Sequence, residues 1–206
     1  QWLYFTPSSG SILLCDLQIL DMFTGSLIGN IFGNTVERKR IDGSSVAYLI
    51  QTPTTQSGCI FKGIDALNID SILAGNGWST GVLIRSFAAP INNIRINMLF
   101  SGRAFIRAMQ IIANGSSISN IDISGTYRSS GAYETVYLQS NNSNKIKNIV
   151  LKNPIVDGKG IGIRLLGVEN IREAGAIFVG CSSRYLVDPV IPPKRAASKS
   201  RINTSP

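Results

Sequence analysis

Apolar and polar positions follow one short pattern that returns along this chain. The pattern is apolar-x-Asn-apolar-x-apolar, and full copies are INNIRI (91–96), ISNIDI (118–123) and IKNIVL (146–151). VENIRE (168–173) deviates only at Glu173, and weaker copies begin at Leu14 and at Phe61, where Gly63 takes the Asn position. The anchor isoleucines, at residues 64, 94, 121, 149 and 171, are separated by 30, 27, 28 and 22 residues.

A second apolar segment precedes each anchor. It reads GVLIRSF, RAFIRAM, TVYLQSN and GIGIRLL, with an earlier copy in VAYLIQT and an irregular last one opened by AIFVG. Such runs of β-branched and aromatic residues, separated by polar turns, predict two short strands in every repeat.

Strand repeats at this period predict a solenoid whose coils stack in parallel, with equivalent residues about 4.8 Å apart. The isoleucines of successive coils then pile into a continuous core. Asn is a poor strand residue but tolerates the left-handed backbone of a sharp bend, and its amide can bond to the Asn of the next coil. Asn93, Asn120, Asn148 and Asn170 are therefore predicted at one corner of the coil, as is Gly63.

Two other architectures compete with the solenoid. An α/β fold needs helical periodicity between its strands, but the connections here are rich in Gly, Ser and Asn. A sandwich or barrel also contains many short strands, and the recurring Asn favours the solenoid over these. The expected organisation is irregular first coils over 1–45, a parallel β-helix over 46–180, and a C-terminal cap or tail over 181–206.

INNIRI, ISNIDI, IKNIVL and VENIRE, with the strands before them, resemble right-handed parallel β-helix proteins of the pectate-lyase-like type, including bacteriophage tailspikes and capsule depolymerases. The resemblance covers about residues 45–180 and is one of fold. It implies an extracellular or virion location, carbohydrate recognition and, for tailspikes, a parallel homotrimer.

Composition agrees with a folded, strand-rich chain. Apolar residues make up 44% and charged residues 16% of the 206 residues, and Gly is abundant. Cys15, Cys59 and Cys181 lie far apart, which predicts reduced, mostly buried thiols and no disulfide framework. The apolar start is interrupted before it could span a membrane, and it has no Lys or Arg before Arg38, so no signal peptide is expected.

The formal net charge of +8 is concentrated toward the C-terminus. Residues 184–206 contain five cations and one anion, a net charge of +4. A solvated or partner-ordered tail is the preferred interpretation, with a nucleic-acid arm as the alternative.

The side chains present restrict the chemistry. The chain has no His, which excludes Ser-His-Asp and Cys-His nucleophiles and a His-ligated zinc site. A glycosidase needs two carboxyl groups roughly 5–10 Å apart, and no such pair can be assigned. Asp122 is expected to form a salt bridge with Arg95 of the previous coil, Asp157 to occupy a turn, and Glu134 to end the longest polar connection. No catalytic residue, metal site or cofactor is assigned.

Two sets of residues are candidates for ligand binding. Arg85, Arg107 and Arg164, with Gln139, each follow the second apolar strand, and stacking would align them in a stripe suited to the carboxylates of an acidic polysaccharide. By resemblance to the lyases, such an Arg could act as a base in β-elimination. The alternative is that these residues pair with loops or another subunit.

The second set lies in residues 126–138. Tyr127, Arg128, Tyr133 and Glu134 are candidates for sugar stacking and hydrogen bonding. Tyr137 is read as a core or inter-subunit residue.

The favoured function is that of a phage tailspike or tail-fibre β-helix. It would bind bacterial surface polysaccharide, assemble as a homotrimer and contact other virion tail proteins, with no membrane insertion and no nucleic-acid partner. The alternatives are a polysaccharide lyase or glycoside hydrolase of this fold, whole or as a fragment, and a purely structural virion protein.

Overall fold

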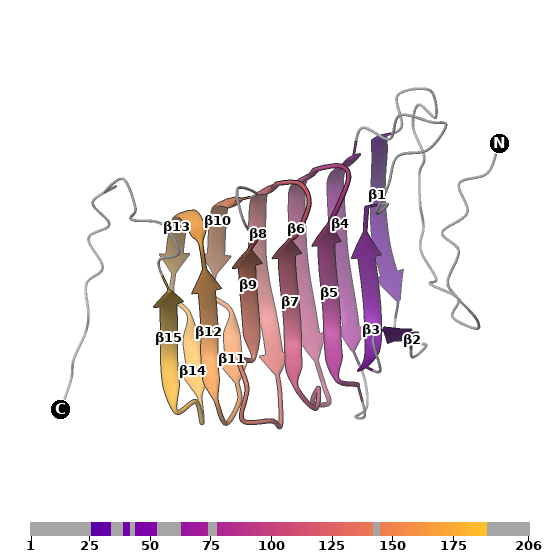
Figure 1. Ribbon diagram of the computed structural model, residues 1–206. Helices are drawn as coiled ribbons and strands as arrows, with labels where there is room; N and C mark the ends of the chain where they lie inside the picture. The colour runs from indigo at the N-terminus through magenta and orange to yellow at the C-terminus, as the bar shows by residue number, and fades with distance from the viewer. Residues whose placement is uncertain are drawn as a thin grey trace.

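The computed structural model describes residues 26–33, 39–41, 44–52, 63–73, 78–141 and 145–188, and these residues contain strands and turns but no helix. Figure 1 shows the strands side by side along one axis. They are β1 (Ser26–Gly33), β2 (Lys39–Ile41), β3 (Ser44–Gln51), β4 (Gly63–Leu73), β5 (Thr80–Ser86), β6 (Ile91–Phe100), β7 (Arg107–Ala113), β8 (Ile118–Arg128), β9 (Val136–Ser140), β10 (Ile146–Lys152), β11 (Ile155–Asp157), β12 (Ile161–Leu166), β13 (Val168–Ala174), β14 (Ile177–Val179) and β15 (Ser183–Asp188).

The strands form two sheets, and the chain contributes to each in turn. The first sheet has the order β1-β4-β6-β8-β10-β13, with β11 and β14 continuing β10 and β13, and the second has the order β15-β12-β9-β7-β5-β3-β2. Every described pairing is parallel except β2 with β3. The predicted parallel β-helix is confirmed.

Parallel pairing extends further than the 46–180 expected for the regular coils. It includes β1 with β4 at one end and β12 with β15 at the other. Residues 1–25 and 189–206, and with them the first weak repeat, Cys15, most of the basic tail and most of the expected cap, lie outside the described residues.

The predicted isoleucine column is confirmed. Ile94 pairs with Ile121, Ile121 with Ile149, and Ile149 with Ile171. The first three of these side chains are almost completely buried, and Ile171 packs against the core as a partly buried residue. Full burial of one such side chain contributes about 1.5–3 kcal/mol, so the column supplies much of the stability that no single coil could provide.

The upstream copy was aligned three residues too early. Ile64 pairs with Ile91 and Asn68 with Arg95, so Leu67 takes the anchor position and Ala66 the Asn position. Ala66 has the corner conformation, with φ of 54°. Gly63 lies at the start of β4 instead. Its φ is 135°, and an added Cβ would lie 2.3 Å from the carbonyl oxygen of Pro90.

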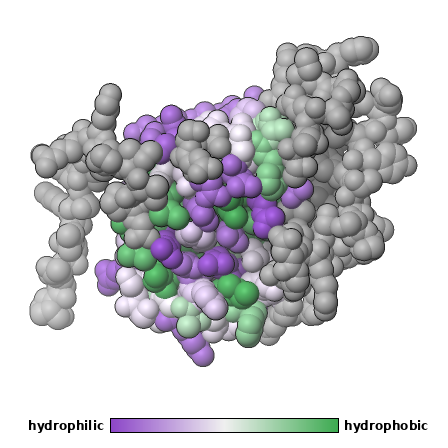
Figure 2. All heavy atoms as spheres, in the orientation of Figure 1, coloured by the Kyte–Doolittle hydropathy of each residue, from purple (hydrophilic) through white to green (hydrophobic). Residues whose placement is uncertain are grey.

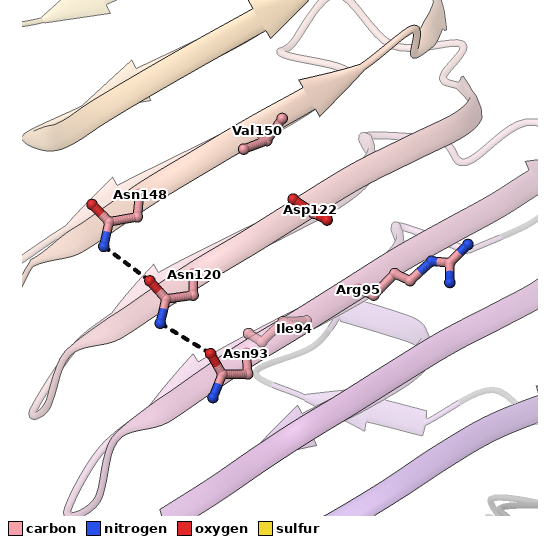
Figure 3. Close-up of a pocket in the computed structure, with 7 residues that line it drawn as sticks. All are labelled: Asn93, Ile94, Arg95, Asn120, Asp122, Asn148 and Val150. Carbon is pink, nitrogen blue, oxygen red and sulfur yellow. Dashed lines mark hydrogen bonds between the residues drawn. The ribbon is translucent and has the colours of Figure 1, made fainter.

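The asparagines occupy the predicted corner. Their φ angles are 54° at Asn93, 57° at Asn120, 55° at Asn148 and 57° at Asn170, all left-handed. Each Nδ2 donates to the Oδ1 of the preceding Asn, at 3.0 Å, 2.9 Å and 3.1 Å along the column, and Asn93 donates to Asp65 at 2.6 Å. Figure 3 shows the first two of these bonds between amides stacked one over another. Asn meets both requirements of this position, because it tolerates the left-handed backbone and its amide forms hydrogen bonds along the solenoid axis.

A second bend divides the first sheet. It is made by Gly125 (φ 100°), Asn153 (φ 48°) and Gly175 (φ 71°). A Cβ on Gly125 would lie 2.2 Å from the carbonyl oxygen of Met98, so no other residue fits without a shift of the backbone. This bend turns the end of β8, and with it β11 and β14, onto a separate outer face.

Burial decreases in the last repeat, where Glu173 replaces an apolar residue. Glu173 is exposed, and Val168 and Ile171 of the same strand are only half-buried. Glu169 forms ion pairs with Lys145 at 3.7 Å and Lys147 at 3.5 Å. The pairing of β12 with β15 nevertheless continues the coil past this point.

Candidate functional site

The predicted arginine stripe does not form. Arg85 lies opposite Ile112, which lies opposite Gln139, so two of the predicted residues do share one column. Arg164, however, lies opposite Tyr137, and Arg107 opposite Thr80. The prediction was wrong because Met109 and Ile111, not Ile106, enter the core beside Val82 and Ile84, which moves Arg107 to the start of its strand.

The structure brings Arg107 and Arg164 together in a different way, around Glu134. Arg107 donates to Glu134 Oε2 from Nη2 at 2.7 Å and from Nε at 3.1 Å, and Arg164 Nη1 donates to Oε1 at 2.9 Å. The Glu134 side chain is buried and the two guanidinium groups are partly exposed. One carboxylate therefore holds two cations in place, leaving a net charge of +1.

Two tyrosine rings complete this cluster. The Arg107 guanidinium lies 5.7 Å from the ring centroid of Tyr133 and 5.0 Å from that of Tyr137, and Arg164 lies 5.7 Å from the Tyr137 centroid. These distances are within the range of cation–π attraction. We call Arg107, Tyr133, Glu134, Tyr137 and Arg164 the guanidinium–aromatic cluster.

Glu134 stays ionised in this setting. Burial acts to raise its pKa, but hydrogen bonds from Arg164 and Arg107 stabilise the carboxylate, and the pKa falls below its ordinary value of 4.5. A carboxyl group with a lowered pKa is a poor proton donor near neutral pH. The geometry of Glu134 therefore suits positioning of the arginines and opposes a role as general acid.

An exposed aromatic residue that the sequence did not identify extends the cluster. Phe105 is 67% exposed and Tyr133 is 57% exposed. Their turns stack directly, because a Cβ on Gly131 would lie 2.4 Å from the Phe105 carbonyl oxygen. The apolar run RAFIRAM predicts a strand that includes Phe105, whereas Phe105 lies in a turn; Ser101 and Gly102, a few residues before it, are the signal for that turn.

Tyr127 cannot be a sugar-stacking residue. Its ring is 0% exposed and packs 5.8 Å from the ring of Phe100, and its hydroxyl donates to the carbonyl oxygen of Ser124 at 2.8 Å. Burial raises its pKa. Tyr127 faces inward because it alternates with Thr126 and Arg128, so its role is in the core.

Arg128 belongs to a separate ionic group. Asp157 Oδ2 lies 2.6 Å from Arg103 Nη2 and 3.6 Å from Arg128 Nε, and Arg103 also donates to the carbonyl oxygen of Ser129 at 3.0 Å. Asp157 is the last residue of β11. Because it pairs with both arginines, it takes part in an ion-pair network in addition to preceding the turn at Gly158. Gln139 donates to Asn141 Oδ1 at 2.7 Å.

A shallow depression lies over the asparagine corner, on the outer face of the first sheet. Its lining residues, shown in Figure 3, are Asn93, Ile94, Arg95, Asn120, Asp122, Asn148 and Val150. Arg95 and Asp122 are neighbours in register, as predicted, but the Asp122 carboxylate pairs with Lys152 Nζ at 2.5 Å, and in Figure 3 the Arg95 guanidinium extends away from it. The hydrogen bonds of this surface serve the fold.

The outer face of the second sheet mixes polar and apolar residues. Figure 2 shows hydrophilic residues beside hydrophobic ones on the face that bears β5, β7, β9 and β12 in Figure 1. Such a mixture is usual for protein surfaces, so hydropathy alone does not distinguish a site on this face.

The described residues contain neither a metal-binding cluster nor a membrane-spanning helix. No three His, Cys, Asp or Glu side chains gather there in a way that could hold a metal ion. No described segment is a helix with the length and hydrophobicity of a membrane span. Cys181 is a half-buried free thiol whose pKa is raised by burial.

Comparison with known proteins gives no relatives. No family model matches the chain, and neither a curated protein nor a solved structure is significantly similar to it. The functional argument therefore depends on the geometry of the chain itself.

Proposed function

We propose that this β-helix binds a bacterial surface polysaccharide through the guanidinium–aromatic cluster together with Phe105. The observation that carries the proposal is the position of Tyr133, a largely exposed ring directly beside the guanidinium of Arg107. Aromatic faces bind the apolar side of pyranose rings, and Arg supplies hydrogen-bond donors for hydroxyl and carboxylate groups.

Preorganisation supports the proposal. Both guanidinium groups are held by Glu134, at 2.7 Å and 2.9 Å, before any ligand arrives. Fixing long side chains in advance removes about 0.5–1.5 kcal/mol of ordering cost for each side chain on binding. The net charge of +1 favours a polysaccharide that carries carboxylate groups.

The stacking of coils indicates how the ligand would lie. Phe105 and Tyr133 belong to adjacent turns, and adjacent coils of parallel strands are about 4.8 Å apart. A glycan running along the axis of the solenoid could therefore place successive sugar rings over successive turns.

The biological setting is part of the same proposal. A parallel β-helix is the fold of the tailspikes that the sequence resembles, so we place the chain on the tail of a bacteriophage, where it recognises the host surface. Assembly as a parallel homotrimer, contacts with other tail proteins and degradation of the bound polysaccharide remain predictions.

The test measures binding of size-defined acidic and neutral capsular oligosaccharides to the full chain by isothermal titration calorimetry. Tyr133→Ala and Phe105→Ala are each expected to weaken binding about tenfold, the loss of about 1.4 kcal/mol, while the melting temperature stays nearly unchanged because both rings are exposed. Val187→Ala, which truncates an exposed apolar side chain elsewhere, is the matched control and should bind like the wild type. Wild-type affinity in both aromatic variants would overturn the proposal.

The same incubations separate a binder from an enzyme. After prolonged contact with polysaccharide, new reducing ends would show hydrolysis, and unsaturated products would show elimination. The lowered pKa of Glu134 leads us to expect neither reaction from that residue.

A further inference from the structure

The outer face beyond the second bend carries an unexpected column of apolar side chains. Leu99 lies opposite Thr126, Thr126 opposite Ile155, and Ile155 opposite Ile177. Leu99, Ile155 and Ile177 are 48%, 37% and 53% exposed. Val179, two residues after Ile177 in β14, is also exposed. We call Leu99, Thr126, Ile155 and Ile177 the outer apolar ladder. Figure 1 shows β11 and β14, which carry half of it, side by side.

The fold does not require apolar residues at these positions. The inward residues that follow them, Phe100, Tyr127 and Val156, are completely buried and fill the core. The outer columns before the bend are mostly polar, including the asparagine corner and the pair of Arg95 with Asp122, although Val150 follows Asp122 in its column. Exposed apolar side chains that recur in one column, interrupted here by Thr126, and serve no internal packing indicate an interaction surface.

A second copy of this chain fits the ladder in spacing. Ladder residues recur about every 4.8 Å along the axis, as the coils do. Another copy has the same repeat, so its ladder can interdigitate with this one at every coil, in the manner of the dry contacts between paired sheets. A partner whose side chains recur at a different spacing would lose register with the ladder after one or two coils.

Charge then selects the orientation of the second copy. The outer column next to the ladder contains Arg128 and Asp157, which are neighbours in register. Within one chain Asp157 Oδ2 lies 3.6 Å from Arg128 Nε and 2.6 Å from Arg103 Nη2, so a second copy would add to an existing ion-pair network. A two-fold axis perpendicular to the solenoid, passing between the coils of Thr126 and Ile155, places Arg128 of each copy opposite Asp157 of the other. The same axis sets Leu99 against Ile177. In a parallel pair this column would instead face the column on the other side of the ladder.

We infer that two copies of the chain associate antiparallel through the outer apolar ladder, with reciprocal Arg128–Asp157 contacts at its edge. Reciprocity of this kind is the property of an isologous two-fold interface. The arrangement differs from the parallel homotrimer that the resemblance implies. It is independent of polysaccharide binding, since the ladder contains no residue of the guanidinium–aromatic cluster.

The first experiment measures the mass of the full chain by sedimentation equilibrium over a wide range of concentrations. We expect a reversible dimer. Ile155→Asn combined with Ile177→Asn should raise the dissociation constant at least about tenfold, because apolar contact at the centre of an interface gives most of its affinity. Leu186→Asn is the matched control, because Leu186 is an aliphatic residue of the second sheet that is 36% exposed, close to the 37% of Ile155, and it should dimerise like the wild type.

The second experiment tests the antiparallel pairing with two charge reversals. Arg128→Asp puts two acids opposite two acids in its own dimer, and Asp157→Arg puts two arginines opposite two arginines, so each variant alone should be monomeric. Mixed in equal amounts, they should form a heterodimer in which every facing pair is complementary. A change confined to contacts within one chain could not be rescued by mixing.

Several results would overturn the inference. They are a monomer or a trimer at every concentration, full dimerisation of the double Asn variant, or no heterodimer on mixing. Circular dichroism checks that each variant is folded. If a charge-reversed variant is unfolded, the double Asn variant, which changes only exposed side chains, still decides whether the ladder forms the interface.

Discussion

The asparagine corner gives the sharpest test of how this sequence makes its fold. Asn120 has two separable roles. Its amide donates to Asn93 and accepts from Asn148, and its backbone has φ of 57°. Asn120→Gly removes the amide but accepts the backbone, whereas Asn120→Ala removes the amide and resists the backbone.

The magnitudes follow from these two roles. The hydrogen bonds of 3.0 Å and 2.9 Å are exposed, so together they contribute about 1–2 kcal/mol. A Cβ without a compensating polar group adds about 1 kcal/mol in the left-handed region. We therefore expect Asn120→Gly to lower the free energy of unfolding by about 1–2 kcal/mol and Asn120→Ala by about 2–3 kcal/mol. Ala66, with φ of 54°, shows that Ala can adopt the corner conformation.

The assay is equilibrium unfolding of the full chain in urea, followed by far-ultraviolet circular dichroism and tryptophan fluorescence. Coincidence of the two transitions checks that a single free energy of unfolding applies. Asn97→Ala is the matched control. Its amide also bonds to neighbouring coils, to Asp70 at 3.2 Å and from Ser124 at 3.4 Å, but Asn97 is not among the residues with positive φ.

Two results would refute this reasoning. If Asn120→Gly is as damaging as Asn120→Ala, the left-handed backbone is not the reason for Asn at this corner. If neither Asn120→Gly nor Asn120→Ala lowers the free energy of unfolding, the amide ladder contributes nothing to stability.

Three further predictions concern residues with distinct roles. Gly125→Ala should destabilise the chain by about 2–4 kcal/mol, seen as a lower urea midpoint, because its Cβ would meet the Met98 carbonyl at 2.2 Å; an unchanged midpoint would contradict the bend. Tyr127→Phe should cost about 1–2 kcal/mol through the lost buried hydrogen bond, while calorimetry should show unchanged polysaccharide affinity; weaker affinity would return this residue to the binding site. The pKa of Glu134 is lowered by folding, so its stabilising contribution is complete above its ordinary pKa of 4.5 and is lost as pH falls through the folded-state value; a pH series of urea midpoints should show this loss in the wild type but not in Glu134→Gln, and parallel profiles would contradict it.

The proposed site shows where sequence reasoning reached its limit. Arg107, Tyr133, Glu134 and Arg164 were each identified from the sequence, and all four lie in one cluster. Their grouping was not predicted, because it joins the end of a turn to positions on β7 and β12. Phe105 was missed because an aromatic residue in a short apolar run looks the same in a strand and in an exposed turn.

What the sequence determined by itself is the first sheet. Only a few residue types tolerate a left-handed corner, so a recurring Asn fixes both the bend and the register there, and Asn93, Asn120 and Asn148 align as expected. The alignment of the copy that contains Ala66 was wrong because this copy has no Asn at the corner position. The second sheet has no recurring corner residue of this kind. Ile163 and Leu165, two residues apart, are both apolar and both face the core. Only packing against neighbouring coils chose between such registers, since a shift of two residues keeps every apolar side chain in the core while it moves Arg164 from one outer column to the next.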